Sequence, residues 1–312
     1  MNPLPTPKLL IICGPTASGK SDLALDLARQ LDAEIVNADS MQVYRGMDIG
    51  TAKTTPAQRA EIPHHLIDIV DPDRLFSAAD FVTAADAAIE TIAAKGKRII
   101  VVGGTGLYIR TLLRGLVDSP SGAGEIRQQL QQEACELGNQ AMLERLRLVD
   151  PELAERIHPN NLVRIIRALE VHQLTGIPLS QYQQEHGFST PRYPFLQIGL
   201  KVERQELYRR IEERVERMLS EGLFEEVQGL LDAGYGAELK SMRAIGYKEA
   251  CAFLAGELGR EEATELIKRD TRRYAKRQLT WFTADPETIW LEYPGNFASI
   301  SRHAIDFFDK EV

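Results

Sequence analysis

The chain has few cysteines and no long apolar run. Its 312 residues include only Cys13, Cys135 and Cys251, which form no Cys-x-x-Cys pair and therefore no disulfide framework or structural zinc pattern. No apolar run approaches the roughly 20 residues that cross a bilayer. The N-terminus, MNPLPTPK, lacks the basic start and apolar core of a secretory signal. We therefore expect a cytoplasmic protein with no membrane partner.

Net positive charge is also lacking. The formal net charge of −8 by itself argues against a nucleic-acid partner, because phosphate backbones attract Lys and Arg. The local distribution is different, since Lys268 to Gln278 (KRDTRRYAKRQ) contains six basic residues and one acidic residue. A solvated helix face and an RNA-contacting surface both explain such a segment, and both interpretations stay open.

The order of apolar segments predicts the α/β class. Short apolar runs at 8–13, 34–38 and 98–102 are typical of buried strands, and 78–94 has helical spacing between two of them. Strands that alternate with helices indicate a parallel sheet with helices on both faces. Further strands are expected at 196–202 and 288–291, late in the chain.

The middle of the chain has helical signals and no convincing strand. Asp150-Pro151 is a helix start, and 161–175 has a helical apolar face that ends before Gly176 and Pro178. We therefore expect a core formed by residues 1–119 and 195–312, with an all-helical domain inserted at 120–194.

A phosphate-binding pattern follows the first predicted strand. Gly14 to Ser21 (GPTASGKS) fits Gly-x-x-x-x-Gly-Lys-Ser/Thr and precedes a helical segment. Backbone N–H groups and the helix N-terminus form an anion cradle, to which Lys20 adds a charge and Ser21 a hydroxyl for Mg²⁺. The phosphate donor stays open, because an ATPase usually ends a later strand in an acidic residue. Here the run at 98–102 continues into Gly103-Gly104-Thr105-Gly106.

Asp39 and Thr105 follow two of the predicted strands. Strand ends on the carboxyl edge of a parallel sheet line the ligand crevice, where Asp39 would be placed to accept a proton. An Asx turn or a helix N-cap is an equally good explanation of Asp39. The glycines around Thr105 are either turn residues or positions where a ligand approaches the backbone, with the Thr105 hydroxyl in contact.

A predicted helix at 203–219 carries an arginine stripe. Arg210, Arg214 and Arg217 share one face. A solvated lattice with Glu206, Glu213 and Glu216 is the favoured interpretation, and an arginine that reaches a diphosphate is the alternative.

Two further patterns are less decisive. Adjacent His64-His65 are poorly spaced for joint metal ligation, so a structural loop is favoured over a metal site. Residues 241–248 (SMRAIGYK) mix basic and aromatic side chains around a glycine, which suits RNA, where bases stack on aromatic or guanidinium planes.

Taken together, these segments resemble a known family. GPTASGKS, DSMQVYRGMDIGTAK, HHLIDIVDP, FSAADF, GGTGLY, HPNN, RAIGYKE and AKRQLTWF occur in this order in bacterial tRNA dimethylallyltransferases. The resemblance spans nearly the whole chain. It implies a P-loop NTPase-like core and transfer of the dimethylallyl group from dimethylallyl diphosphate, with Mg²⁺ present. The acceptor is the exocyclic amine of the adenosine on the 3′ side of the anticodon, in tRNAs that read codons beginning with U.

The resemblance also implies roles for particular residues. Asp39 is the expected general base, Thr105 lies near the leaving oxygen, and Lys20 serves catalysis. The expected diphosphate ligands are Gly14, Pro15, Thr16, Ala17, Ser18, Gly19, Lys20, Ser21 and, with less certain correspondence, Arg214. The expected tRNA-contacting residues are Asp39, Ser40, Met41, Gln42, Thr105, Arg127, Val163, Arg164, Ile165, Ile166, Arg167, Arg243, Ala244, Ile245, Gly246, Tyr247 and Lys248.

Two positions depart from the family pattern. Gly106 stands where many relatives carry Met, which would loosen the prenyl pocket, and Val163 stands where some carry Gln, which would remove a tRNA contact. Three other functions are alternatives to this one. They are an ATP-dependent small-molecule kinase, an isopentenyltransferase acting on free adenine nucleotides, and a non-catalytic RNA-binding GTPase. The helical insert and residues 243–248 favour tRNA, and no NKxD-like guanine signal is present. A monomer is expected.

Overall fold

The computed structural model describes residues 6–117, 124–187 and 190–310. It contains two compact units, Met1–Leu113 with Arg192–Val312, and Arg114–Pro191. These unit limits compare with the domain boundaries at 119/120 and 194/195 that the sequence predicts. Each unit is described by itself below.

The first unit is built on a six-stranded sheet in which every pairing is parallel. The strand order is β3-β2-β4-β1-β5-β6. The strands are β1 (Leu9–Cys13), β2 (Ala33–Asn37), β3 (His64–His65), β4 (Arg98–Val102), β5 (Phe195–Leu200) and β6 (Thr288–Leu291). Every residue of β1 and β2 is buried, as expected for strands covered on both faces. The predicted α/β class with a parallel sheet is confirmed.

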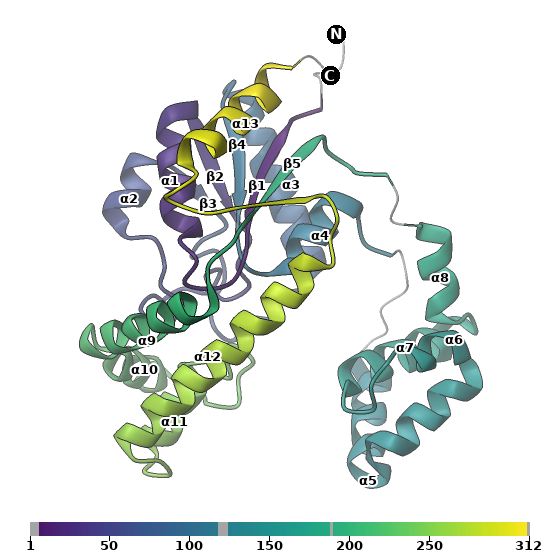
Figure 1. The fold of residues 1–312 in the computed structure, drawn as a ribbon. Coiled ribbons are helices and arrows are strands. Elements are labelled where there is room, and N and C mark those ends of the chain that lie inside the picture. The colour runs from purple at the N-terminus through teal and green to yellow at the C-terminus, as the bar shows by residue number, and fades with distance from the viewer. Residues whose placement is uncertain (1–5, 118–123, 188–189, 311–312) are drawn as a thin grey trace. The chain divides into compact units, whose positions relative to one another are not determined.

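Helices cover both faces of this sheet (Figure 1). Those of the first unit are α1 (Lys20–Leu31), α2 (Pro56–Glu61), α3 (Ala78–Ala94), α4 (Gly106–Arg114), α9 (Arg204–Ser220), α10 (Leu223–Asp232), α11 (Tyr247–Leu254), α12 (Arg260–Thr283) and α13 (Phe297–Asp309). On one face, Leu23 and Leu27 of α1 share a core with Ile300 of α13. On the other, Phe81 of α3 and Ile109 of α4 do the same.

The turn between β1 and α1 requires two glycines in the left-handed region. Gly14 has a φ of 139° and Gly19 a φ of 91°, which L side chains rarely adopt. A Cβ on Gly14 would also lie 3.3 Å from the backbone of Leu200 on β5. The chain therefore turns tightly from the central strand into α1, at the same end of the sheet where α9 to α12 gather (Figure 1).

His64 and His65 form β3 rather than the loop that the sequence predicts. They pair with Ile35 and Val36 of β2, so their backbone groups belong to the sheet edge. The sequence signal was weak because a strand of this length shows no alternation.

Every regular element among the described residues of the second unit is a helix. It contains α5 (Gly124–Val149), α6 (Pro151–Glu155), α7 (Leu162–Thr175) and α8 (Leu179–His186) around its own apolar core. The predicted helix start is confirmed, because Asp150 Oδ1 accepts from the backbone N–H of Leu153 at 3.1 Å. Its Oδ2 accepts from the N–H of Ser180 at 2.9 Å, which joins the starts of α6 and α8. No helix among the described residues of either unit is long and apolar enough to span a bilayer.

Candidate active site

A cavity of about 370 Å³ lies in the first unit, at the carboxyl ends of β1, β2 and β4. The phosphate loop, the loop after β2, the turn after β4, α9, α12 and the segment before α11 each contribute to it. Its polar lining includes Thr16, Lys20, Ser21, Asn37, Asp39, Ser40, Gln42, Arg214, Arg243, Tyr274, Arg277 and Gln278. The predicted phosphate loop, Asp39 to Gln42, Arg214 and residues 243–246 thus meet at one cavity, although they are far apart in the sequence.

Lys20 lines the cavity and bonds back to the phosphate loop. Its Nζ donates to the carbonyl of Pro15 at 2.5 Å. Burial, followed by the nearby Arg214 charge, lowers the pKa of Lys20 to about 8, although Asp39 opposes this shift. The lowered pKa means that burial disfavours the charged form of Lys20, and a bound anion would favour that form. The buried Ser18 hydroxyl also has no hydrogen-bond partner among the described residues.

Arg214 supplies a second cation to the same cavity. Burial is the main cause that lowers its pKa, and the Arg217 charge acts in the same direction while Asp39 raises it. No described residue forms an ion pair with Arg214, whereas Arg210 on the same helix pairs with Glu206 at 2.7 Å. The lattice interpretation is therefore correct for Arg210 and wrong for Arg214, which faces the cavity with Lys20 beside it.

Asp39 combines both of the interpretations that the sequence left open. Its Oδ1 accepts from the backbone N–H of Met41 at 2.8 Å and from that of Gln42 at 3.4 Å, which is the Asx turn. No described residue donates to Oδ2, and the residue lines the cavity. One oxygen thus orders the loop while the other is available to a ligand.

Thr105 connects the turn after β4 to the Asp39 loop. Its Oγ1 accepts from the backbone N–H of Ser40 at 3.0 Å, and its own N–H donates to the carbonyl of Ala38 at 3.2 Å. A Cβ on Gly103 would lie 2.1 Å from that carbonyl, so glycine is required there for close packing. Thr105 itself is not among the described residues that line the cavity.

Gly106 does not widen the cavity as the sequence comparison suggested. A Cβ at this position would lie 2.2 Å from the ring of Trp281 on α12. The indole therefore occupies the space that a larger residue at position 106 would need.

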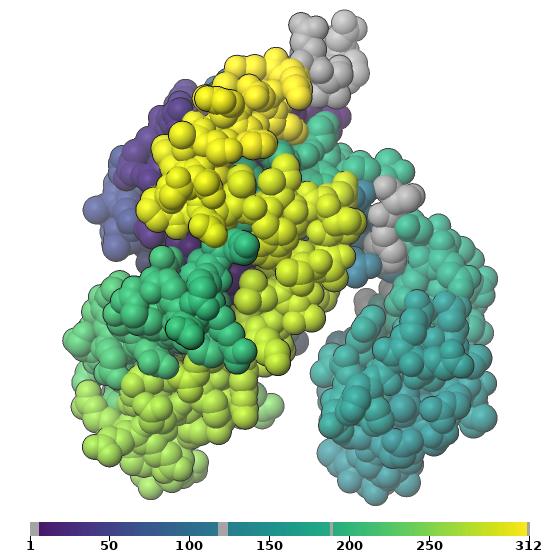
Figure 2. Space-filling view, viewed as in Figure 1, coloured from purple at the N-terminus to yellow at the C-terminus, as the bar shows by residue number. Residues whose placement is uncertain are grey.

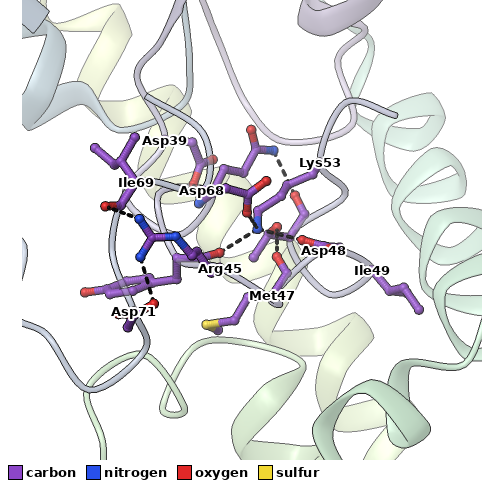
Figure 3. Close-up of polar contacts among 12 residues, drawn as sticks. Asp39, Arg45, Met47, Asp48, Ile49, Lys53, Asp68, Ile69 and Asp71 are labelled. Atoms are coloured by element: carbon purple, nitrogen blue, oxygen red, sulfur yellow. Dashed lines mark hydrogen bonds and ion pairs between the residues drawn. The ribbon is translucent and has the colours of Figure 1, made fainter. Parts of the chain in front are cut away.

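A buried lysine orders the loop between β2 and α2 (Figure 3). The Lys53 side chain is 2% exposed. Its Nζ donates to the carbonyl of Tyr44 at 2.5 Å, to Asp48 at 2.6 Å and to Asp68 at 2.5 Å. These bonds hold the loop that begins at Asp39 in place. They give Asp48 and Lys53, the two ends of the family motif Asp-Ile-Gly-Thr-Ala-Lys, a structural role.

Residues 243–248 divide into cavity-lining and buried members. Arg243, Ala244, Ile245 and Gly246 line the cavity. The Tyr247 ring is fully buried against Gly50, and the exposed Lys248 pairs with Asp270 at 2.9 Å. This burial leaves no ring face on which a base can stack, so Tyr247 acts on any RNA contact only by positioning the segment.

The candidate tRNA-contacting residues of the second unit also divide by burial. Val163 is 82% exposed and Arg164 is exposed, whereas Ile165 and Ile166 belong to the apolar core of this unit. The most exposed side chains of the 163–167 stretch are therefore the first two. Arg127 and Arg167 are partly exposed, and both pair with the buried Glu170, at 2.7 Å and 2.9 Å.

The described residues contain no group of three or more His, Cys, Asp and Glu side chains that can hold a metal ion. His64 Nδ1 lies 2.7 Å from the carbonyl of Ile62, and His65 Nε2 lies 2.7 Å from Glu34. The Ser21 hydroxyl and the Asp39 carboxylate are hard oxygen donors that suit Mg²⁺, but a cation between them would need further oxygens from a ligand.

An apolar wall and two amide side chains of the cavity were not predicted from the sequence. Ile211, Val215 and Met218 of α9 and Ile267 of α12 line the cavity beside Arg214. The signal was present, since Arg214 lies within an apolar stripe of helical spacing, where a solvated arginine is out of place. The amides of Asn37 and Gln278 line the cavity as well, and Asn37 Nδ2 has no partner among the described residues.

These features define a P-loop α/β protein whose cavity combines the cations Lys20 and Arg214 with an open carboxylate oxygen and an apolar wall. The IPP transferase family model matches residues 42–285, and the chain belongs to that family. It is 70% identical to tRNA dimethylallyltransferase 1 of Pelobacter propionicus, over 97% of this chain and 98% of the relative. It is 64% identical to tRNA dimethylallyltransferase 2 of Geotalea uraniireducens, over 96% and 97%.

Two solved structures are also similar. The tRNA isopentenylpyrophosphate transferase from Bacillus halodurans has 40% identity and a TM-score of 0.72, with 97% of each chain covered. A eukaryotic dimethylallyltransferase acting on tRNA has 30% identity and a TM-score of 0.81, over 96% of this chain and 78% of that one.

Proposed function

We propose that this protein transfers the dimethylallyl group of dimethylallyl diphosphate to the exocyclic amine of an adenosine in tRNA. The observation that carries the proposal is the cavity, where Lys20 and Arg214 lie beside the apolar wall of Ile211, Val215 and Met218. A prenyl diphosphate matches these two parts of the cavity, because it has a polyanionic end and a small branched apolar end. The names of the relatives contain the dimethylallyl group and tRNA.

The phosphate loop binds the diphosphate end. The backbone N–H groups of residues 17–21 and the N-terminus of α1 suit an anion, whereas Pro15 has no N–H and that of Thr16 donates to Gln278. Lys20 and Arg214 add charges that neutralise the negative charge as it builds up on the departing diphosphate. The Ser21 hydroxyl would hold a Mg²⁺ ion, which would supply further neutralisation of the diphosphate when bound.

Asp39 accepts the proton of the reaction. The adenosine amine attacks C1 of the dimethylallyl group, the bond between C1 and the bridging oxygen breaks, and diphosphate leaves with the electron pair. The amine nitrogen then loses a proton to the Oδ2 of Asp39, which no described protein group occupies. Thr105 supports this step by ordering Ser40, next to Asp39.

The acceptor is the adenosine on the 3′ side of the anticodon, in tRNAs that read codons beginning with U. Its amine is part of a base stack, so the nucleotide must be extruded to reach a cavity of this depth. Arg243 and Arg277 at the cavity, with Arg127, Val163 and Arg164 of the helical unit, provide tRNA contacts. We place the protein in the cytoplasm as a monomer.

The test is a reconstituted reaction. The purified chain, Mg²⁺, dimethylallyl diphosphate and unmodified tRNA should yield N6-isopentenyladenosine and diphosphate. An equivalent reaction with free adenosine monophosphate should yield far less product. Hydrolysis or transfer of ATP phosphate without prenylation would support the kinase alternative and refute the proposal.

A further inference from the structure

Gln278 of α12 bridges two loops of the cavity. Its Oε1 accepts from the backbone N–H of Thr16 at 2.8 Å, and its Nε2 donates to the carbonyl of Gly104 at 2.9 Å. The side chain is 5% exposed, so water does not compete for these bonds. A helix near the end of the chain thus joins the phosphate loop to the turn after β4. Figure 2 shows that other side chains of α12 reach the surface of the molecule.

The bridge requires an amide. It uses an acceptor toward one loop and a donor toward the other, and among side chains of this length only glutamine provides both without the protonation of a carboxyl group. The turn is packed directly against it, because a Cβ on Gly104 would lie 2.2 Å from Gln278 Nε2. The position of this amide therefore sets the separation of the two loops.

Each loop leads on to a group of the proposed reaction. Thr16 belongs to the diphosphate cradle that contains Lys20. Gly104 precedes Thr105, whose Oγ1 accepts from the N–H of Ser40, next to Asp39. A continuous path of hydrogen bonds and short backbone segments therefore runs from the cradle, through Gln278, to the carboxylate.

We infer that Gln278 is a positioning residue that sets the distance between the diphosphate cradle and the base Asp39. This inference rests on the proposed function. Group transfer is sensitive to such geometry, since a displacement of about 1 Å can lower a rate by about 10²-fold. The Gln278 side chain bonds to backbone atoms of the two loops and not to a substrate. Its loss should therefore affect the transfer step more than it affects the binding of either substrate.

Two substitutions test this role by their pH dependence. Gln278→Glu keeps an acceptor for Thr16 but sets a carboxylate against the Gly104 carbonyl. We expect its single-turnover rate near pH 8 to be lower by about 10- to 100-fold, with each KM within about threefold of the wild-type value. Burial raises the pKa of the introduced carboxyl group, and its protonated form can donate to Gly104. The rate relative to wild type should therefore recover as the pH falls toward about 6.

Gln278→Met has similar volume and loses both bonds, so its deficit should be the same at every pH. Gln197→Met is the matched control, because Gln197 is also a buried glutamine, bonded to Asp285 at 2.9 Å and Thr288 at 2.6 Å. This control should lower the melting temperature without changing the transfer rate. Wild-type-like rates in both Gln278 variants, or a Gln278→Glu deficit that does not change with pH, would overturn the inference. Absence of transfer by the wild-type chain would instead refute the proposed function.

Discussion

The Tyr247 hydroxyl donates a 2.6 Å hydrogen bond to Glu226 Oε1, and this pair joins α11 to α10. Glu226 Oε2 also accepts from the backbone N–H groups of Asp48 at 2.9 Å and Ile49 at 2.7 Å. One carboxylate therefore holds both the loop that begins at Asp39 and the segment that contains Arg243. It positions two of the proposed ligand-contacting segments without lining the cavity itself.

Glu226→Ala should destabilise the first unit by roughly 2–3 kcal/mol, because the Tyr247 hydroxyl and three loop N–H groups lose their acceptor. We expect the melting temperature in scanning calorimetry to fall by several degrees. The neighbouring exposed Glu225→Ala is the control and should melt close to the wild-type temperature. Equal melting temperatures for all three proteins would contradict the role of the carboxylate.

The lowered pKa of Lys20 predicts a pH-dependent affinity for diphosphate. With a pKa of about 8, the amine is charged below that pH and neutral above it. The Kd of inorganic diphosphate should therefore rise as the pH passes through about 8, since an anion binds the charged form. Lys20→Arg keeps its charge throughout, so its Kd for diphosphate should change less with pH in calorimetric titration. The ionisation of diphosphate itself affects both proteins equally. Parallel profiles would refute the titration of Lys20 in this range.

Asp39→Asn separates the two roles of Asp39. The amide oxygen can still accept from the Met41 N–H and keep the Asx turn, but it cannot accept a proton as a base. We expect the transfer rate to fall by about 10²- to 10⁴-fold with the Kd for tRNA within a few-fold. Asp73→Ala, at an exposed aspartate, is the control. Normal turnover by Asp39→Asn would exclude this residue as the base.

Arg243→Ala tests the RNA-contacting surface at the cavity. We expect weaker tRNA binding, and a plot of log K against log salt concentration whose slope is smaller by about 0.7–0.9, as for the loss of one phosphate contact. Arg209→Ala is a suitable control, because Arg209 is an exposed arginine paired with Glu206 at 2.8 Å and with Glu213. An unchanged slope and affinity would place the RNA contact elsewhere.

Local patterns predicted much of the fold. The apolar run at 98–102 and the helical period at 78–94 coincide with the bounds of β4 and α3, because buried strands and amphipathic helices carry their signal within one segment. The break of α5 at Gly138 was not predicted, since a lone glycine in a helical pattern is often tolerated.

The site was predictable only where its chemistry lies in a contiguous motif. Residues 14–21 and Asp39 were found in this way. The bond from Gln278 to Thr16 spans 262 positions and the pair of Tyr247 with Glu226 joins two helices, so no local pattern contains either. Arg214 was only partly predictable, because only its apolar helical neighbours distinguish it from the solvated arginines nearby.

The most direct test of the central claim is nucleoside mass analysis of unmodified tRNA after incubation with the purified protein, Mg²⁺ and dimethylallyl diphosphate. We predict N6-isopentenyladenosine on the adenosine 3′ to the anticodon, formed only when both substrates are present and lost in Asp39→Asn. An unmodified tRNA after incubation with folded, diphosphate-binding protein would contradict the account.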